Sequence, residues 1–365
     1  MKLLPLHQVS AQVRAGAALP FSIRDADGTL LLARGQVVAS DDALALLMKR
    51  GATVDVEEVS RRAEAVAPPA ENFPGRWHQL TVRAAVVLRP PLGDDFLDRV
   101  NDIREQLAGM AGRDADMLLY LALRTARDPG PQYGVLHALH VATVCALLGP
   151  RMGLGESQQT SLMNAALTMN LSIVDLQSRL GGAALPPTPA LREMIDRHAE
   201  DSAALLRKAG VEDEAWLSLV AEHDAPARDG QAEEPGAALK LLRLVDGYTT
   251  RITDRPDTII ASPALAAKDL FAKHAQDPMA LMLVKTLGVY PPGCFVRIAS
   301  GETAVVLRRG EAANKPLVAC ITNKRGDALQ QPIRRDTGLL PEHAITAVVP
   351  DKEVKVRMPS QLLYA

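Results

Sequence analysis

The feature that most constrains the fold is a helical repeat of apolar residues that runs from about Trp77 to Tyr290. In the stretch DDFLDRVNDIREQLAGM, apolar side chains recur at the spacing that places them on one face of a helix. Glycine and proline pairs interrupt the repeat and mark the ends of helices. The pattern predicts further helices at 114–127, 133–149, 157–180, 189–209, 213–224, 237–252 and 262–286.

The period changes after Tyr290, where FVRIAS, ETAVVLRR and PLVACITN are short runs of branched apolar residues, typical of a small sheet. Near the N-terminus, FSIRDADGTLLLARGQVV predicts two strands, and DDALALLMKRG predicts a helix with Ser40 or Asp41 as its N-cap. SRRAEAVAPPAENFPG is rich in proline, alanine and charge, which indicates a linker. We therefore expect a mainly α protein with an N-terminal α/β module at 1–60, a linker at 61–76, a helical domain at 77–290 and a β-rich extension at 291–365.

Composition argues against several classes of partner. The net charge of −2 and the pI of about 6.5 give no overall attraction to nucleic acid, and the 3% aromatic content argues against a base-stacking surface. No run of 18 uncharged apolar residues predicts a membrane span, and the start lacks the apolar core of a signal peptide. The scattered cysteines Cys145, Cys294 and Cys320 form no CxxC pair and are expected to be reduced. We expect a cytoplasmic protein that binds neither DNA nor RNA.

Four ionisable side chains fall on the apolar faces of the predicted helices. His137 lies four residues before Val141 and therefore shares its face, and His198, His223 and Asp246 have comparable positions on three other helices. Any one of them alone is most simply a core residue satisfied by a carbonyl or a neighbouring charge. Four in one bundle are costly to bury unless they pair or bind a cation. A paired polar core and a metal site both stay open at this point.

A series of motifs resembles, in the same order, those of the HD-GYP domain, a bacterial branch of the HD phosphohydrolase superfamily. HALHVA begins at His137, RHAEDSAALLRKAG carries His198, VAEHDAPARDG carries His223, and LRLVDGYTTRITDRP carries Asp246. The most specific match is LGVYPPGCFVRIASGETAVVLRR, which is similar to the strand region at the end of that domain. The resemblance covers residues 95–323 and implies an HD-type helical bundle.

The resemblance also implies a chemistry. HD-GYP proteins bind two or three divalent cations, commonly iron or manganese, and use a metal-bridging hydroxide to cleave the phosphodiester of cyclic di-GMP. Such metals lower the pKa of bound water and stabilise the charge of the transition state. On this resemblance His137, His198, His223 and Asp246 stand at metal-ligand positions, and Asp224 stands where a further histidine is expected.

The stretch AALTMNLS departs from the pattern of these proteins. Their His-Asp pair aligns with Met169 and Asn170, and the glycine and lysine that follow align with Ser172 and Ile173. A thioether is a poor ligand for iron(II), manganese or magnesium, and a neutral amide cannot act as the anionic bridge between two dications. Ile173 removes a lysine that could contact a phosphate. The Gly-Tyr-Pro triplet has no counterpart in DGQAEEPGAA.

These departures predict that the binuclear hydrolytic centre is lost. The leading hypothesis is a catalytically degenerate HD-GYP-like bacterial signalling protein that acts by binding and needs no cofactor. The alternative is a metal-dependent phosphohydrolase or cyclic di-GMP phosphodiesterase with a reduced site, in which His198, His223 and Asp224 hold a single iron or manganese ion. A third hypothesis is an interaction scaffold without a small-molecule ligand.

The hypotheses imply different partners. Another signalling protein or cyclic di-GMP is expected for the first, and a homodimer is compatible with all three. If a phosphate binds without a metal, Arg251 and Arg255 are the cations expected to meet it, because they lie near the end of the Asp246 helix. Solvated surface positions are expected for the arginine pairs Arg61-Arg62, Arg308-Arg309 and Arg334-Arg335.

Overall fold

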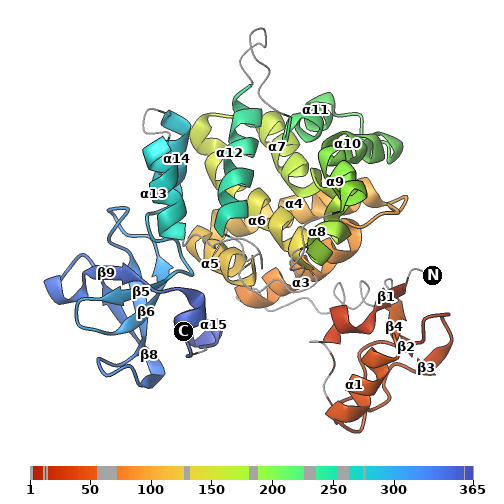
Figure 1. Cartoon of the computed structure of the whole chain (residues 1–365), viewed down its shortest axis with the longest axis horizontal. Helices are drawn as coiled ribbons and strands as arrows, with labels where there is room; N and C mark the ends of the chain where they lie inside the picture. The colour runs from red at the N-terminus through yellow and green to blue at the C-terminus, as the bar shows by residue number, and fades with distance from the viewer. Residues whose placement is uncertain are drawn as a thin grey trace. The chain divides into compact units, whose positions relative to one another are not determined.

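The structure, a computed structural model, describes residues 3–10, 13, 15–55, 72–126, 132–180, 188–225, 236–252, 263–273, 277–356 and 358–364 (Figure 1). The chain divides into two compact units, Met1–Val86 and Val87–Ala365. Most of the predicted linker lies outside the described residues, and helix α3 (Phe73–Val87) begins four residues before the predicted start of the helical region. The predicted domain boundaries at 60, 76 and 290 stay predictions.

The first unit contains a small antiparallel sheet in the order β1-β4-β2-β3, together with helix α1 (Asp41–Lys49). The side chain of Ser40 caps α1 by accepting a hydrogen bond from the backbone N–H of Ala43. Gly51 follows the helix with a φ of 74°, a conformation that glycine adopts without strain. The predicted α/β character and the Ser40 cap are confirmed. The strands are β1 (Leu3–Pro5), β2 (Ile23–Arg24), β3 (Leu30–Leu32) and β4 (Thr53–Asp55).

The second unit is a helical bundle followed by a sheet, so the predicted mainly α architecture is confirmed. Its longer helices before the sheet are α4 (Phe96–Arg113), α5 (Ala115–Ala126), α6 (Tyr133–Leu148), α7 (Glu156–Thr168), α8 (Val174–Leu180), α9 (Pro189–Asp196), α10 (His198–Lys208), α11 (Glu214–Glu222), α12 (Ala237–Ile252), α13 (Pro263–Lys273) and α14 (Pro278–Leu287).

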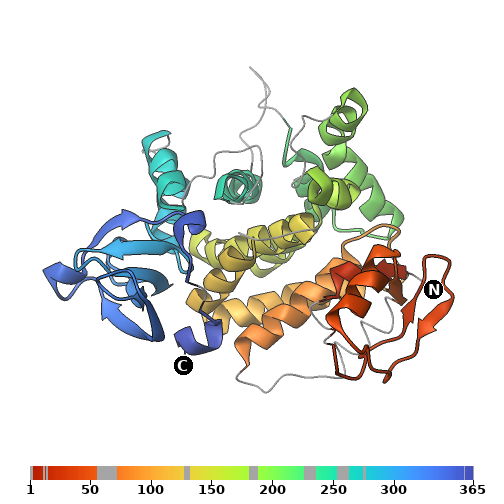
Figure 2. The same cartoon turned by 60° about the horizontal axis from the view of Figure 1, so that its bottom comes forward.

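Helix α6 lies at the centre of the bundle, where α4, α5, α7, α8, α12 and α14 pack against it (Figure 1 and Figure 2). A helix that is apolar on all sides is expected at such a position. By length and composition alone, the segment Tyr133–Met152 could cross a membrane. However, 89% of its apolar stretch of 18 residues is buried inside the structure. Its burial is that of a core helix.

Three helices that were predicted to be continuous are broken. The predicted helix at 157–180 is interrupted by the short 3-10 helix η5 (Leu171–Ile173), and the one at 189–209 breaks at Arg197. The third, at 262–286, is wrong because α14 starts anew at Pro278, capped by Asp277. Apolar periodicity alone does not locate the first two breaks. At the third, Asp277 followed by Pro278 is a helix-start signal that the prediction did not use.

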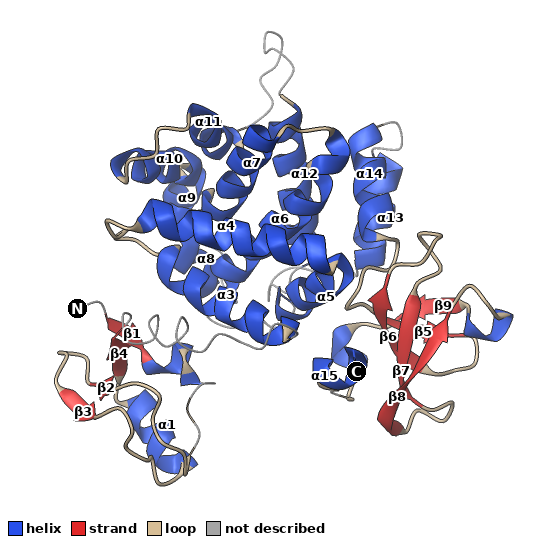
Figure 3. Cartoon of the chain, turned by 180° about the vertical axis from the view of Figure 1, so that it is seen from behind, coloured by secondary structure: helices blue, strands red, loops and turns tan. Residues whose placement is uncertain are grey.

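The C-terminal sheet is antiparallel, with the strand order β8-β7-β6-β5-β9 (Figure 3). The prediction of β5 (Phe295–Ile298), β6 (Thr303–Arg308) and β7 (Leu317–Thr322) is confirmed. The edge strands β8 (Ala328–Asp336) and β9 (Ile345–Val348) were not predicted, because neither is a buried apolar run. A last short helix, α15 (Ser360–Tyr364), follows the sheet.

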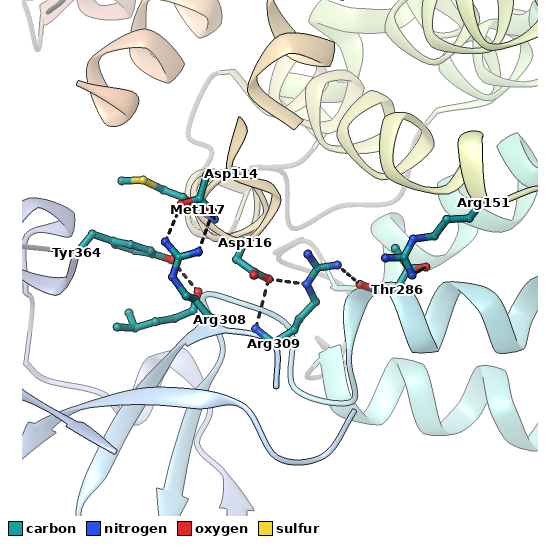
Figure 4. A network of polar contacts seen from close by, with 9 residues as sticks. Asp114, Asp116, Met117, Arg151, Thr286, Arg308, Arg309 and Tyr364 are labelled. Atoms are coloured by element: carbon teal, nitrogen blue, oxygen red, sulfur yellow. Dashed lines mark hydrogen bonds and ion pairs between the residues drawn. The ribbon is translucent and has the colours of Figure 1, made fainter. Parts of the chain in front are cut away.

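Two ion pairs join this sheet to the N-terminal end of α5 (Figure 4). Arg308 donates to both carboxylate oxygens of Asp114, at 3.1 and 2.7 Å. Arg309 donates to Asp116 at 2.5 Å and to the carbonyl oxygen of Thr286 at 2.6 Å. The predicted surface position is confirmed for Arg308, whose side chain is 44% exposed, whereas Arg309 is half-buried. The prediction did not include their carboxylate partners, which lie more than 190 positions away in the sequence.

Candidate functional site

The candidate site begins with His137 on the central helix α6. Its Nε2 lies 2.8 Å from Oδ1 of Asp246 on α12, and its ring stacks on Tyr133 with 5.9 Å between ring centroids. Because a carboxylate only accepts, the Nε2 atom donates the hydrogen of this bond. The Nδ1 atom of His137 is buried and has no hydrogen-bond partner among the described residues. The structure thus brings together two of the predicted ligand residues as a closed pair.

A second pair is formed by His198 at the start of α10 and His223 at the end of α11. The Nε2 atoms of the two rings lie 3.0 Å apart. Nδ1 of His198 lies 2.5 Å from the carbonyl oxygen of Ile195, and Nδ1 of His223 lies 2.8 Å from that of Val220. Because carbonyl oxygens only accept, both Nδ1 atoms carry the hydrogen, and two Nε2 lone pairs face each other. Such a contact is favourable only with a proton or a cation between the rings.

Asp224 lies on the other side of the His198 ring. Its Oδ2 atom is 3.9 Å from Nδ1 of His198, whereas the lone pair of that ring is on Nε2. The Asp224 side chain is 63% exposed. The three residues predicted to hold a single cation are therefore neighbours, but the carboxylate does not lie beside the two facing nitrogens.

The turn between α7 and α8 carries the residues that the sequence resemblance aligns with the His-Asp pair. Met169 is fully buried, and Asn170 and Ile173 are also buried. Ser172 ties this turn to α10, because its hydroxyl donates to the carbonyl oxygen of His198 at 2.9 Å. Its backbone N–H donates to the hydroxyl of Ser202 at 3.1 Å. Sequence reasoning missed this serine pair, since neither residue stands out in a periodic pattern.

Burial dominates the electrostatics of the site. It lowers the pKa of His223, and the neighbouring His198 lowers it further, against opposing contributions from the Val220 carbonyl and the carboxylates of Asp246 and Asp224. Burial also lowers the pKa of His140 to about 3. His140 is buried on α6, three residues after His137, and its Nδ1 has no partner in the part of the chain that the structure describes.

Of the two arginines predicted to meet a phosphate, Arg251 is exposed in the last turn of α12, the helix that carries Asp246. Arg255 lies outside the described residues. A helix C-terminus favours a cation, so the position of Arg251 also has a local electrostatic reason.

The donor set does not fit a binuclear centre. Among the described residues, no group of three or more histidine, cysteine, aspartate or glutamate side chains is arranged to hold a metal ion. The turn that would supply a further imidazole and a bridging carboxylate presents a thioether and a neutral amide, and neither suits a hard dication. A single cation between His198 and His223 agrees with the two facing lone pairs, but those two nitrogens would be its only described protein ligands.

No protein-family model and no curated protein matches the chain. Its structure is similar to that of Bd1817, a HDG"Y"P protein from Bdellovibrio bacteriovorus, with a TM-score of 0.52. The sequences are 13% identical, and the match covers 78% of this chain and 98% of that chain. At this identity the likeness concerns the fold alone. The chain has an HD-GYP-like, mainly α fold, as the sequence motifs predicted.

Proposed function

We propose that this chain is a catalytically degenerate HD-GYP-like bacterial signalling protein that acts in the cytoplasm by binding. The observation that carries the proposal is the buried pair Met169 and Asn170, at the positions where the resemblance places a histidine and the bridging aspartate. Without an anionic bridge, the repulsion between two dications is not offset. The hydrogen bond between His137 and Asp246 further supports the proposal, because it pairs two of the predicted ligand residues with each other.

The expected partner is another signalling protein or cyclic di-GMP, with a homodimer compatible with either. For a nucleotide, exposed Arg251 is the described cation expected to contact a phosphate, and Arg255 is its predicted companion. Isothermal titration of the wild type and of Arg251→Ala with cyclic di-GMP tests this part. Binding that is equally tight in both proteins would remove Arg251 from the proposal.

Turnover and metal content test whether the binuclear hydrolytic centre is lost. Protein purified without oxygen is loaded with iron(II) or manganese(II), analysed by elemental mass spectrometry and assayed with cyclic di-GMP. We expect near-zero retained metal and no turnover. Two metals per chain with turnover would sink the proposal, and would mean that the alignment of Met169 and Asn170 with the ligand positions is wrong.

The facing nitrogens of His198 and His223 favour a second candidate, a phosphohydrolase with a single metal. A cation bound there would supply the Lewis acid that lowers the pKa of a water molecule. The outcome of one metal per chain, lost together with turnover in His198→Ala, would favour this candidate. Retention of metal in His198→Ala would place the metal elsewhere.

A further inference from the structure

A cavity of about 250 Å³ lies between α5, the C-terminal sheet and the last residues of the chain. Phe295 on β5 and Val305 on β6 are register partners, so their side chains lie on the same face of the sheet, and both line the cavity. Ile321 on β7 and Leu363 on α15 complete its apolar walls, and all four side chains are buried. None of the predicted metal-ligand residues lines this cavity.

The cavity offers no free charge among its described lining residues. Arg124 on α5 is the charged side chain there, and its guanidinium lies 4.6 Å from the centre of the Phe295 ring. The same guanidinium donates to the carboxylate of Asp351 and, at 3.4 Å, to the carbonyl oxygen of Gly293. Because the charge of Arg124 is already paired with Asp351, Arg124 adds little to the binding free energy of an anionic ligand. A neutral ligand can bind without leaving that charge unpaired.

The C-terminal segment forms one wall, and Tyr364 fixes its end. The Tyr364 hydroxyl donates to the carbonyl oxygen of Leu307 at 2.9 Å. Its ring packs edge-to-face on Tyr120, with 5.3 Å between centroids. Val356, Met358 and Ser360 therefore reach the cavity from a segment whose end is held in place.

We propose that this cavity binds a neutral, mainly apolar small molecule, a site separate from the proposed signalling function. An apolar cavity of about 150 Å³ accommodates benzene, and drug-sized ligands use about 300–1,000 Å³. The volume here suits a molecule of one or two rings. Thr125 donates its hydroxyl hydrogen to the carbonyl oxygen of Leu121 at 2.7 Å, so its oxygen keeps the capacity to accept one hydrogen bond from the ligand.

Indole, which has two rings and one N–H donor, is a suitable probe. Full-length protein with ¹³C-labelled methionine methyl groups is titrated with indole and followed by NMR. We expect a saturable ring-current shift of the Met358 methyl and none at Met194, which is exposed on α9. No shift at Met358 up to the solubility limit of indole, or an equal shift at Met194, would overturn the proposal.

A substitution that fills the cavity provides a second test of the proposed site. Val356 is half-buried, so Val356→Phe is expected to place its ring in the cavity and abolish the Met358 shift without unfolding the protein. Leu362→Phe is the matched control, because Leu362 is exposed on the same segment and does not line the cavity. Circular dichroism checks that both variants are folded. Unchanged indole binding by folded Val356→Phe would contradict the assignment of the site.

Discussion

The Nε2 atoms of His198 and His223 face each other across 3.0 Å, while Nδ1 of each ring faces a backbone carbonyl oxygen. The repulsion of the two lone pairs makes the metal-free pair a source of instability. In His223→Gln a side-chain amide can donate to Nε2 of His198, so we expect metal-free variant protein to be as stable as the wild type or about 1 kcal/mol more stable. Urea unfolding in the presence of a chelator measures the difference.

The same variant separates the two candidate functions. Under the binding hypothesis, neither wild type nor His223→Gln changes its melting temperature when manganese(II) is added. Under the single-metal alternative, the wild type melts at a higher temperature with the metal and the variant does not respond. A loss of several kcal/mol in metal-free His223→Gln would mean that the wild-type rings already share a proton.

Burial of neutral His140 makes stability depend on pH. Its pKa is about 3 in the folded protein and near the ordinary 6.5 when unfolded, so between these values the unfolded chain binds more protons. The stabilisation is complete above pH 6.5 and is lost as the pH falls. From pH 6.5 to pH 5 the loss attributable to His140 is about 2 kcal/mol. We expect the unfolding free energy of His140→Leu to fall less steeply over this window, and the same slope in both proteins would exclude His140 as the cause.

Gly134 allows α6 to approach α8 closely. A Cβ atom at this position would lie 2.5 Å from the carbonyl oxygen of Val174, a backbone atom that cannot turn aside. Gly134→Ala is expected to destabilise the protein by about 2–3 kcal/mol. Gly109→Ala is the control, since Gly109 is exposed on α4 with no atom within 4 Å of a Cβ; that change should stabilise by about 0.5–1 kcal/mol. Chemical denaturation of both variants measures the contrast.

The ion pair between Arg308 and Asp114 is expected to contribute modestly, because both side chains are partly exposed. A double-mutant cycle with Arg308→Met and Asp114→Asn should give a coupling energy of about 0.5–1 kcal/mol at low salt and less at high salt. Burial raises the pKa of Asp114, but the hydrogen bonds and charge of Arg308 and the backbone N–H of Met117 outweigh it and hold this pKa below its ordinary value. The coupling is therefore present above about pH 4 and is lost as the pH falls through the folded pKa. The pair Arg99 and Asp95 is the control: its N–O distance is longer, 3.6 Å, and its carboxylate is more exposed, 63% against 21% for Asp114, so it should show almost no coupling.

If the centre is degenerate as proposed, a histidine and an aspartate introduced at positions 169 and 170 should restore part of the metal response. Met169→His with Asn170→Asp places an imidazole and a carboxylate at two buried positions of the turn. Because a buried carboxylate is costly without a partner, we expect the double variant to be less stable than the wild type without metal and to be stabilised by manganese(II). Melting curves with and without manganese measure this response. Equal curves would show that more than these two ligands has been lost.

The sequence predicted the burial of the polar residues better than their contacts. The helical spacing placed His137, His198 and His223 on apolar faces, and all three are buried. The spacing could not predict that His198 and His223 face each other through Nε2. That contact depends on the hydrogen bonds of their Nδ1 atoms to the carbonyl oxygens of Ile195 and Val220, near two helix ends. Those boundaries are where apolar periodicity is least informative.

Contacts between distant parts of the chain also escaped prediction. Arg308 and Arg309 form a short basic run in sequence, which usually indicates a solvated surface. Their carboxylate partners precede them by more than 190 residues, at the start of helix α5. Nothing local to either segment signals such a pairing, whereas the residue pattern of β5 to β7 was a local signal and was sufficient.

The hydroxyl contacts between Ser172, Ser202 and the carbonyl of His198 have one more consequence. A metal centre acts as a crosslink between the segments that ligate it, and a site that loses its metal ordinarily loses that restraint. Here neutral hydrogen bonds join the turn that carries Met169 and Asn170 to the helix that begins at His198. The position of the His198 imidazole is therefore supported by side chains that have no part in coordination, and under the proposed degeneracy the shape of the site would persist without a metal.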